Sequence, residues 1–167
     1  MCRDQQIPLE KAFAGPLILA ERLGVDKLDP AALADYDPDG FTALFATPPA
    51  IHRFPKAMAE RTQKLARTIV EDFDGDPASV WTGAADGADL VARVATLPGF
   101  GAQKAKIFTA LLGKQFGVQP RGWRAAAGDF GKQGSRLSVA DIVDADSLVK
   151  VREHKKQMKA AAKAKAS

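Results

Sequence analysis

Apolar and polar residues follow a helical period along most of the chain, and the clearest example is residues 55–73. Leu65 and Ile69 share one side of a helix drawn through this segment, while Lys64 and Arg67 share the other. Pro55 stands at the first turn, where its missing backbone N–H does no harm. The pattern therefore predicts an amphipathic helix with one face on a core.

The same period predicts further helices, while strand-like alternation of apolar and polar residues is rare. These helices cover residues 4–24, 30–34, 41–47, 86–97 and 102–113, followed by a last helix that begins at Ser138. Pro16 is expected to bend or divide the first helix, and Gly24 to end it. Asp141, three residues after Ser138, completes a capping pattern. The predicted fold class is all-α.

Positive charge is concentrated near the end of the chain. From residue 149 onward, seven Lys or Arg and one Glu give +6, which leaves −2 for the rest of a chain whose net charge is +4. A basic tail suits phosphate backbones through counterion release, although a solvated helix end that keeps the protein soluble is the alternative. The single cysteine, Cys2, excludes an internal disulfide or an all-cysteine metal site. Without a long apolar run or a signal-peptide pattern, we expect a cytoplasmic protein with no membrane contact.

The sequence "LPGFG" at residues 97–101 separates two of the predicted helices. Pro98 cannot continue the first helix, while Gly99 and Gly101 allow backbone angles and close approaches that a Cβ would block. The second helix then begins with unpaired N–H groups, and its dipole favours an anion such as a phosphate. Gln103, Lys104 and Lys106 add donors and charge. An ordinary tight turn between helices is the alternative.

Several segments, in order, resemble the helix-hairpin-helix (HhH-GPD) DNA glycosylases of base-excision repair. They are "DQQI" near the start, "RFPKAMAERTQKLA" in the middle and "VATLPGFGAQKA" at the turn, and the resemblance runs from about residue 4 to about residue 123. The "QQ" segment is most similar to the alkyladenine branch of that family. The resemblance implies a two-lobed helical fold, with a helical domain over residues 1–120 that contains the motif at 87–114. Residues 121–167 would pack as part of the second lobe.

The resemblance also implies how such a protein would hold duplex DNA with a damaged base. Gly99, Gly101 and Gln103 would present amides to a phosphate, and Gln6, or else Gln5, would fill the gap left by the flipped-out base. A surface position on a helix is the alternative for Gln6. A monovalent cation would be held by the main-chain carbonyls of three residues, Ala95, Leu97 and Phe100. The protein would act as a monomer in the cytoplasm, associated with the nucleoid.

The chain departs from the family where catalysis is concerned. Members that also cleave the sugar have Lys where this chain has Gln103, so we expect no lyase activity, and the missing cysteines exclude an iron–sulfur cluster. The family's catalytic carboxylate would fall near Arg121 and Trp123, and the next carboxylate is Asp129. Asp129 is therefore the catalytic candidate, with a helix cap or surface residue as the alternative. Arg121 and Trp123 could contact DNA, or Trp123 could anchor a core.

Three functional hypotheses follow. The first is a monofunctional N-glycosylase that removes a damaged, possibly alkylated, base flipped out of the duplex. The second is a DNA-binding protein of the same fold that has lost the catalytic aspartate. The third is a helical interaction protein without a DNA role. The segment before Asp4 also lacks the apolar helix of the family pattern, which suggests an N-terminally shortened chain.

Overall fold

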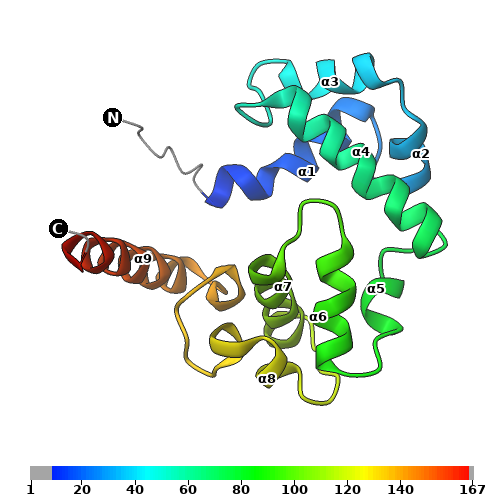
Figure 1. The fold of residues 1–167 in the computed structure, drawn as a ribbon. Helices are drawn as coiled ribbons and strands as arrows, with labels where there is room; N and C mark the ends of the chain where they lie inside the picture. The colour runs from blue at the N-terminus through cyan, green and yellow to red at the C-terminus, as the bar shows by residue number, and fades with distance from the viewer. Residues whose placement is uncertain (1–8, 166–167) are drawn as a thin grey trace. The chain divides into compact units, whose positions relative to one another are not determined.

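The structure is a computed structural model that describes the backbone of residues 9–165 and the side chains of residues 14–162 and 164. All regular elements in this part of the chain are helices, which confirms the all-α prediction (Figure 1). The α-helices are α1 (Leu9–Leu23), α2 (Pro30–Asp35), α3 (Pro38–Ala46), α4 (Pro55–Asp72), α5 (Ser79–Thr82), α6 (Gly87–Thr96), α7 (Ala102–Gln115), α8 (Trp123–Ala126) and α9 (Ala145–Lys165). Two short 3-10 helices, η1 (Gly128–Gly131) and η2 (Val139–Asp141), lie between α8 and α9.

The chain forms two compact units, and each has its own core. Unit 1 ends at Pro77 and contains α1 to α4, while unit 2 begins at Ala78 and contains α5 to α9. The division predicted at residue 120 therefore falls inside unit 2. The segment after residue 120 belongs to unit 2 because α8 and both 3-10 helices pack directly against α7.

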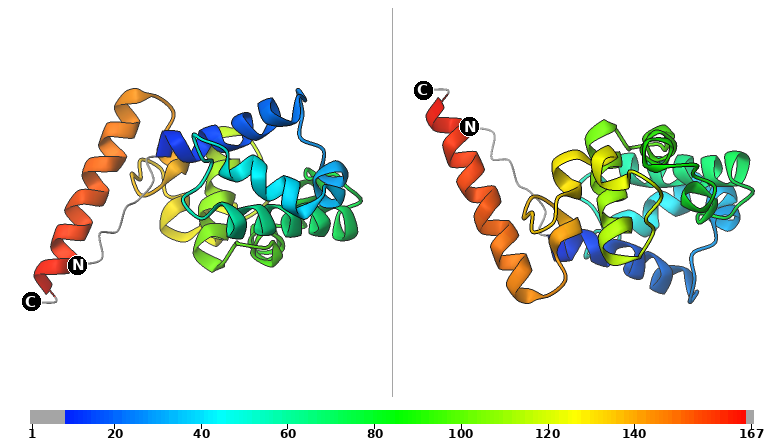
Figure 2. Two further views of the ribbon diagram at one scale, coloured as in Figure 1. Left: turned by 90° about the horizontal axis from the view of Figure 1, so that it is seen from above. Right: turned by 90° about the horizontal axis from the view of Figure 1, so that it is seen from below.

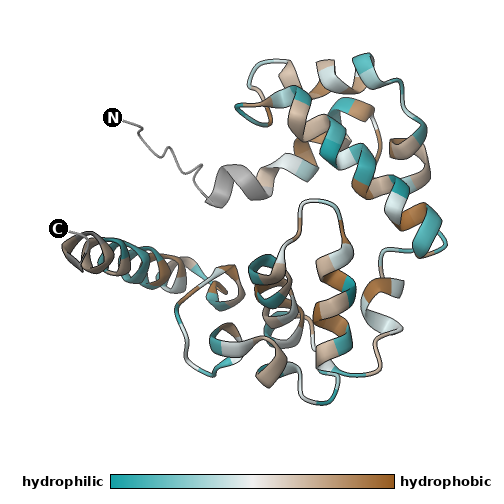
Figure 3. Ribbon diagram, viewed as in Figure 1, coloured by the Kyte–Doolittle hydropathy of each residue, from teal (hydrophilic) through white to brown (hydrophobic). Residues whose placement is uncertain are grey.

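The core of unit 1 is built where α2 and α3 pack on α4. Phe41 and Phe45 of α3 are buried, with their ring centroids 5.2 Å apart. On α4, the buried face contains Gln63, whose side-chain amide donates to the carbonyl of Tyr36, the residue that follows α2, at 2.8 Å. The polar side chain is therefore satisfied inside the core. Hydrophilic and hydrophobic residues alternate along α4, as its amphipathic sequence predicts (Figure 3).

Two helices of unit 1, α1 and α3, show how the structure compares with the sequence-based expectation. Pro16 lies inside α1, which continues to Leu23 and ends as predicted at Gly24, where φ is +67°. Pro16 thus does not divide the helix. Helix α3 begins at Pro38 rather than at residue 41, because the Asp37 carboxylate accepts the Gly40 N–H at 2.7 Å and caps the helix earlier.

The core of unit 2 lies between α6 and α7 and is closed by α8. Leu90 and Val94 of α6 are fully buried. A Cβ on Gly113 of α7 would lie only 2.5 Å from the Trp123 ring, so the glycine makes room for the indole. Close packing of α8 on α7 therefore depends on a residue without a side chain.

The last predicted helix is two helices in the structure. Ser138 and Asp141 form the expected capping box, but the helix that begins there is only the short η2. Helix α9 starts separately at Ala145, where Asp144 accepts the Ser147 N–H at 2.7 Å. The prediction of one helix from Ser138 was wrong because a second cap follows six residues after the first. Within the described residues, no helix is long and apolar enough to cross a membrane.

Candidate nucleic-acid interface

The turn between α6 and α7, residues 97–101, is tightly folded. Leu97 is buried and its carbonyl accepts the Phe100 N–H at 3.0 Å. Gly99 has a φ of +87°, in the left-handed region that favours glycine. Gly101 has an extended backbone, and a Cβ there would meet no atom within 4 Å. The first glycine is therefore needed for the turn itself, whereas the second leaves open space in front of α7.

Helix α7 begins at Ala102 without a side-chain cap. The first intrahelical bond runs from the Ala105 N–H to the Gly101 carbonyl, so the amides of residues 102–104 have no acceptor within the described part of the chain. These N–H groups carry the positive end of the helix dipole. The α6–α7 turn thus presents unpaired donors beside open space.

Basic and polar side chains surround these amides. Gln103, Lys104 and Lys106 are all exposed. The Lys104 ammonium donates to the Gly99 carbonyl at 2.9 Å, which holds this charge beside the turn. The predicted phosphate-binding residues of the α6–α7 turn therefore lie together at one end of α7, and their combined charge is positive.

The predicted cation-binding carbonyls belong to residues around the same turn. Ala95 lies in the last turn of α6, and Leu97 and Phe100 are in the turn. The Leu97 carbonyl already accepts an amide, and an ammonium group occupies the neighbouring Gly99 carbonyl. No cluster of three or more His, Cys, Asp or Glu that could bind a metal occurs in the described residues. A cation on the carbonyls remains a prediction from the resemblance.

Asp129 lies in η1 and is an exposed carboxylate, with 72% of its side chain accessible. Its ion pair with Lys132 has an N–O distance of 2.6 Å. The hydrogen bond and charge of Lys132 lower the pKa of Asp129, and the charge of Lys106 on α7 adds to this effect. Asp129 also lines a shallow, open depression of about 480 Å³ on the surface of unit 2, together with Arg136 and His154. It is therefore an ionised carboxylate at the edge of an open depression, and the positive charge of Lys106 on α7 acts on it.

Trp123 is buried, with 6% exposure, and its ring covers Gly113. The Arg124 guanidinium lies 4.5 Å from the ring centroid. The burial of Trp123 favours its interpretation as a core anchor. A ring buried in this way does not offer a face for stacking on a base. Arg121 is exposed, and its carbonyl accepts the Gly87 N–H at the start of α6 at 2.9 Å.

A partly buried polar cluster in unit 2 was not predicted. Lys114 forms an ion pair with Asp141 at 2.5 Å and donates to the Ser135 hydroxyl at 2.8 Å. Ser135 in turn donates to Asp141 at 2.8 Å. Asp141 also accepts the backbone N–H groups of Leu137 and Ser138. The cluster fastens the segment before η2 to α7, and only the capping role of Asp141 was visible in the sequence.

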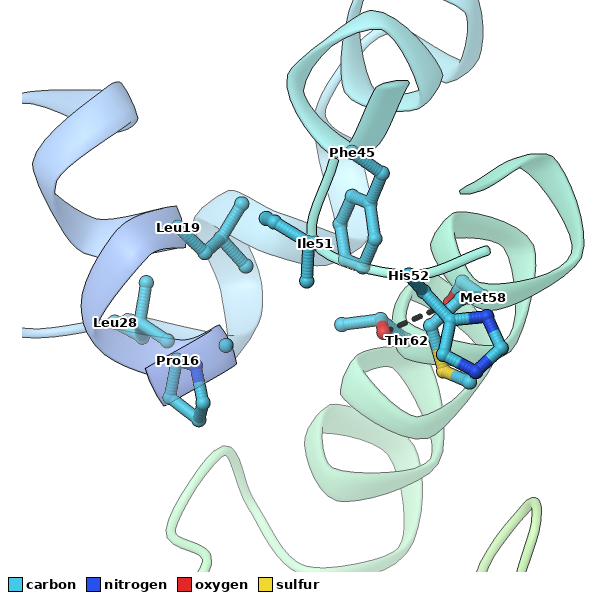
Figure 4. A pocket seen from close by; sticks show the side chains of 9 residues that line it. Pro16, Leu19, Leu28, Phe45, Ile51, His52, Met58 and Thr62 are labelled. Carbon is cyan, nitrogen blue, oxygen red and sulfur yellow. Dashed lines mark hydrogen bonds between the residues drawn. The ribbon is translucent and has the colours of Figure 1, made fainter. Parts of the chain in front are cut away.

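Unit 1 contains a separate apolar cavity of about 370 Å³ between α1, α3 and α4 (Figure 4). Leu19, Phe45 and Met58 line it, with His52 and Thr62 as its polar residues. The His52 Nδ1 accepts the Phe54 N–H at 3.1 Å, while the Thr62 hydroxyl donates to the Met58 carbonyl at 2.9 Å. Both polar side chains thus have partners in their own unit.

Gln5 and Gln6, the candidates for filling the gap left by a flipped base, lie outside the described residues. No protein family, curated protein or solved structure matches this chain. The assignment of function therefore depends on the residues and the local geometry.

Proposed function

We propose that the chain is a DNA-repair protein whose α6–α7 turn works as a helix-hairpin-helix that binds the backbone of duplex DNA. The main support is the uncapped start of α7, where unpaired amides meet open space at Gly101. A phosphate placed there would accept hydrogen bonds from these amides and lie at the positive end of the helix dipole. Lys104 and Lys106 would add attraction at the same end.

The proposed activity is removal of a damaged base, with alkylated bases as the first candidates, by a monofunctional N-glycosylase. Breaking the glycosidic bond builds positive charge on the sugar, so an ionised carboxylate can stabilise the transition state. Asp129 has the required charge, because Lys132 lowers its pKa, and it lines an open depression on the surface of unit 2. Gln103 in place of a lysine supports hydrolysis without strand cleavage.

A second candidate is DNA binding without base removal. It is favoured by the exposure of Asp129, because a carboxylate in water and paired with Lys132 stabilises a nearby cation weakly. It is favoured also by the burial of Trp123, near which the resemblance expects the catalytic carboxylate. The two candidates share the DNA contact and differ only in the chemistry.

The DNA contact is tested by Gln103→Glu. A glutamate in the first turn of α7 should stabilise the helix through its dipole, but should repel a phosphate at the same amides. We expect affinity for duplex DNA to fall at least tenfold while the melting temperature stays equal or rises. Lys27→Gln, at an exposed position of unit 1, changes the net charge equally and serves as the control. Equal loss of affinity for duplex DNA in both variants would argue against a phosphate contact at the α6–α7 turn.

Base release is tested on duplexes that carry 3-methyladenine, 7-methylguanine, hypoxanthine, uracil or 8-oxoguanine. Release by the unchanged protein, reduced at least a hundredfold in Asp129→Asn, would support the glycosylase and assign the carboxylate. Equal release by both proteins would place the chemistry on another residue. Salt-dependent binding without any release would favour the second candidate.

A further inference from the structure

Helix α9 carries a row of cations that the α6–α7 turn does not explain. Arg152, Lys155, Lys156 and Lys159 are all exposed. At 100° per residue, their positions fall within an arc of about 100° on the helix. The four residues are called the α9 stripe below. Figure 2 shows α9 as one continuous helix in both views.

The anchored part of α9 lies before the stripe. Val151 is fully buried, while every described residue of α9 after it except His154 is exposed. Within the described residues, Lys155, Lys156 and Lys159 form no ion pair. Their charges therefore face solvent along the exposed part of the helix. Ions from the solvent must neutralise them, and those ions can be released when a polyanion binds.

Charge and shape favour a nucleic-acid backbone as the partner of this surface. The stripe extends over about 10 Å of helix axis, at 1.5 Å per residue. A DNA duplex carries one phosphate per strand for about every 3.4 Å of its axis, so several phosphates lie within reach. A membrane surface would need large apolar residues opposite the charges. At 100° per residue, the side of α9 opposite the stripe instead has Lys150, His154, Gln157 and Ala161, and the exposed apolar residues Val149 and Met158 are nine positions apart.

We propose that the α9 stripe is a second contact with the DNA backbone, independent of sequence and separate from the α6–α7 turn. This inference rests on the proposed DNA binding. The stripe supplies counterion release and therefore affinity, whereas the uncapped amides of α7 fix one phosphate by hydrogen bonds. Each stripe residue in contact with a phosphate contributes about 0.9 to the slope of log K against log salt.

The test compares the unchanged full-length chain with two α9 variants, by titration with an undamaged duplex at several salt concentrations. The first variant neutralises the stripe: Arg152→Gln, Lys155→Gln, Lys156→Gln and Lys159→Gln. The second variant exchanges residues within α9, as Lys155→Gln with Gln157→Lys and Lys159→Ala with Ala161→Lys. Because the exchanged variant keeps composition and net charge, it serves as the matched control, and circular dichroism checks that both variants keep their helix content.

We expect the salt slope to fall by up to about four in the neutralised variant and by about two in the exchanged variant. An exchanged variant with the original slope would overturn the inference, because net charge alone would then explain the effect. A slope unchanged by neutralisation, with binding still sensitive to Gln103→Glu, would overturn the stripe and leave the proposed function intact. Absence of salt-dependent binding by the unchanged chain would overturn both. α9 variants that lose binding to phosphatidylserine vesicles but keep the original salt slope with DNA would overturn the stripe alone.

Discussion

At the residue scale, glycines of unit 2 perform different tasks that their sequence context does not separate. Gly99 adopts a positive φ, Gly101 leaves space open, and Gly113 makes room for the Trp123 ring. Only the first task depends on local backbone conformation. The other two depend on what lies opposite the glycine, and for Gly113 this is a residue ten positions later in the chain.

Replacing Gly113 by alanine should destabilise unit 2. The new Cβ would lie 2.5 Å from the indole of Trp123, a ring that is buried and cannot move aside without disturbing α8. Overpacking of this kind costs about 1–3 kcal/mol. The measurement is the free energy of unfolding in urea, followed by tryptophan fluorescence and circular dichroism.

Gly101→Ala is the matched control for this variant, since a Cβ at Gly101 meets no atom within 4 Å and the backbone is extended. Its free energy of unfolding should change much less. A loss of stability that is equal in the two variants would contradict the assigned role of Gly113.

At the element scale, helix ends explain where sequence reasoning succeeded and where it failed. The caps Asp37, Asp86 and Ser138 each accept a backbone N–H of the following turn. Ser138 was predicted as a cap, and it is one. The element it caps is only η2, because the Asp144 and Ser147 pair begins α9 anew. A cap therefore fixes the start of a helix but not its length.

The start of α9 should weaken in acid. The Ser147 hydroxyl and the Ser147 N–H both donate to the Asp144 carboxylate. These two hydrogen bonds, with the hydroxyl contributing more, hold the pKa of Asp144 below the usual value of 3.8. The ionised form is thus favoured in the folded state, so its stabilisation is present above pH 3.8 and is lost as the pH falls through the lowered value. Hydrogen exchange of the first α9 amides should accelerate, relative to exchange in an unfolded chain, as the pH falls below 3.8.

Asp144→Asn is the matched control, because asparagine also caps helices but does not titrate. Its relative exchange rates at the start of α9 should stay flat over the same range. A pH dependence as steep as that of the unchanged chain would show that another group is responsible.

At the scale of the whole molecule, the two units have separate cores. Phe41 and Phe45 belong to the core of unit 1, and Leu90 and Val94 to that of unit 2. The α6–α7 turn, Asp129 and the α9 stripe all belong to unit 2. The proposed DNA contacts therefore need only this half of the chain.

A fragment of residues 78–167 should fold by itself. Its helices already pack on one another, with α6, α8 and both 3-10 helices in contact with α7. We expect a cooperative thermal transition by circular dichroism and salt-dependent binding to duplex DNA. Gly113→Ala in the fragment should lower its melting temperature. A fragment without a cooperative transition would show that unit 1 is needed to complete the core.

The sequence by itself determined the features that depend on neighbours along the chain: helical periods, caps, the turn at residues 97–101 and the position of basic residues on α9. Tertiary structure decided what depends on distant residues. It buried Trp123 over Gly113, joined Lys114 to Asp141 and left Asp129 exposed in the field of Lys106. The physical reason is range. Backbone hydrogen bonds and capping act within a few residues, whereas burial and ion pairing depend on which surfaces meet when the helices pack.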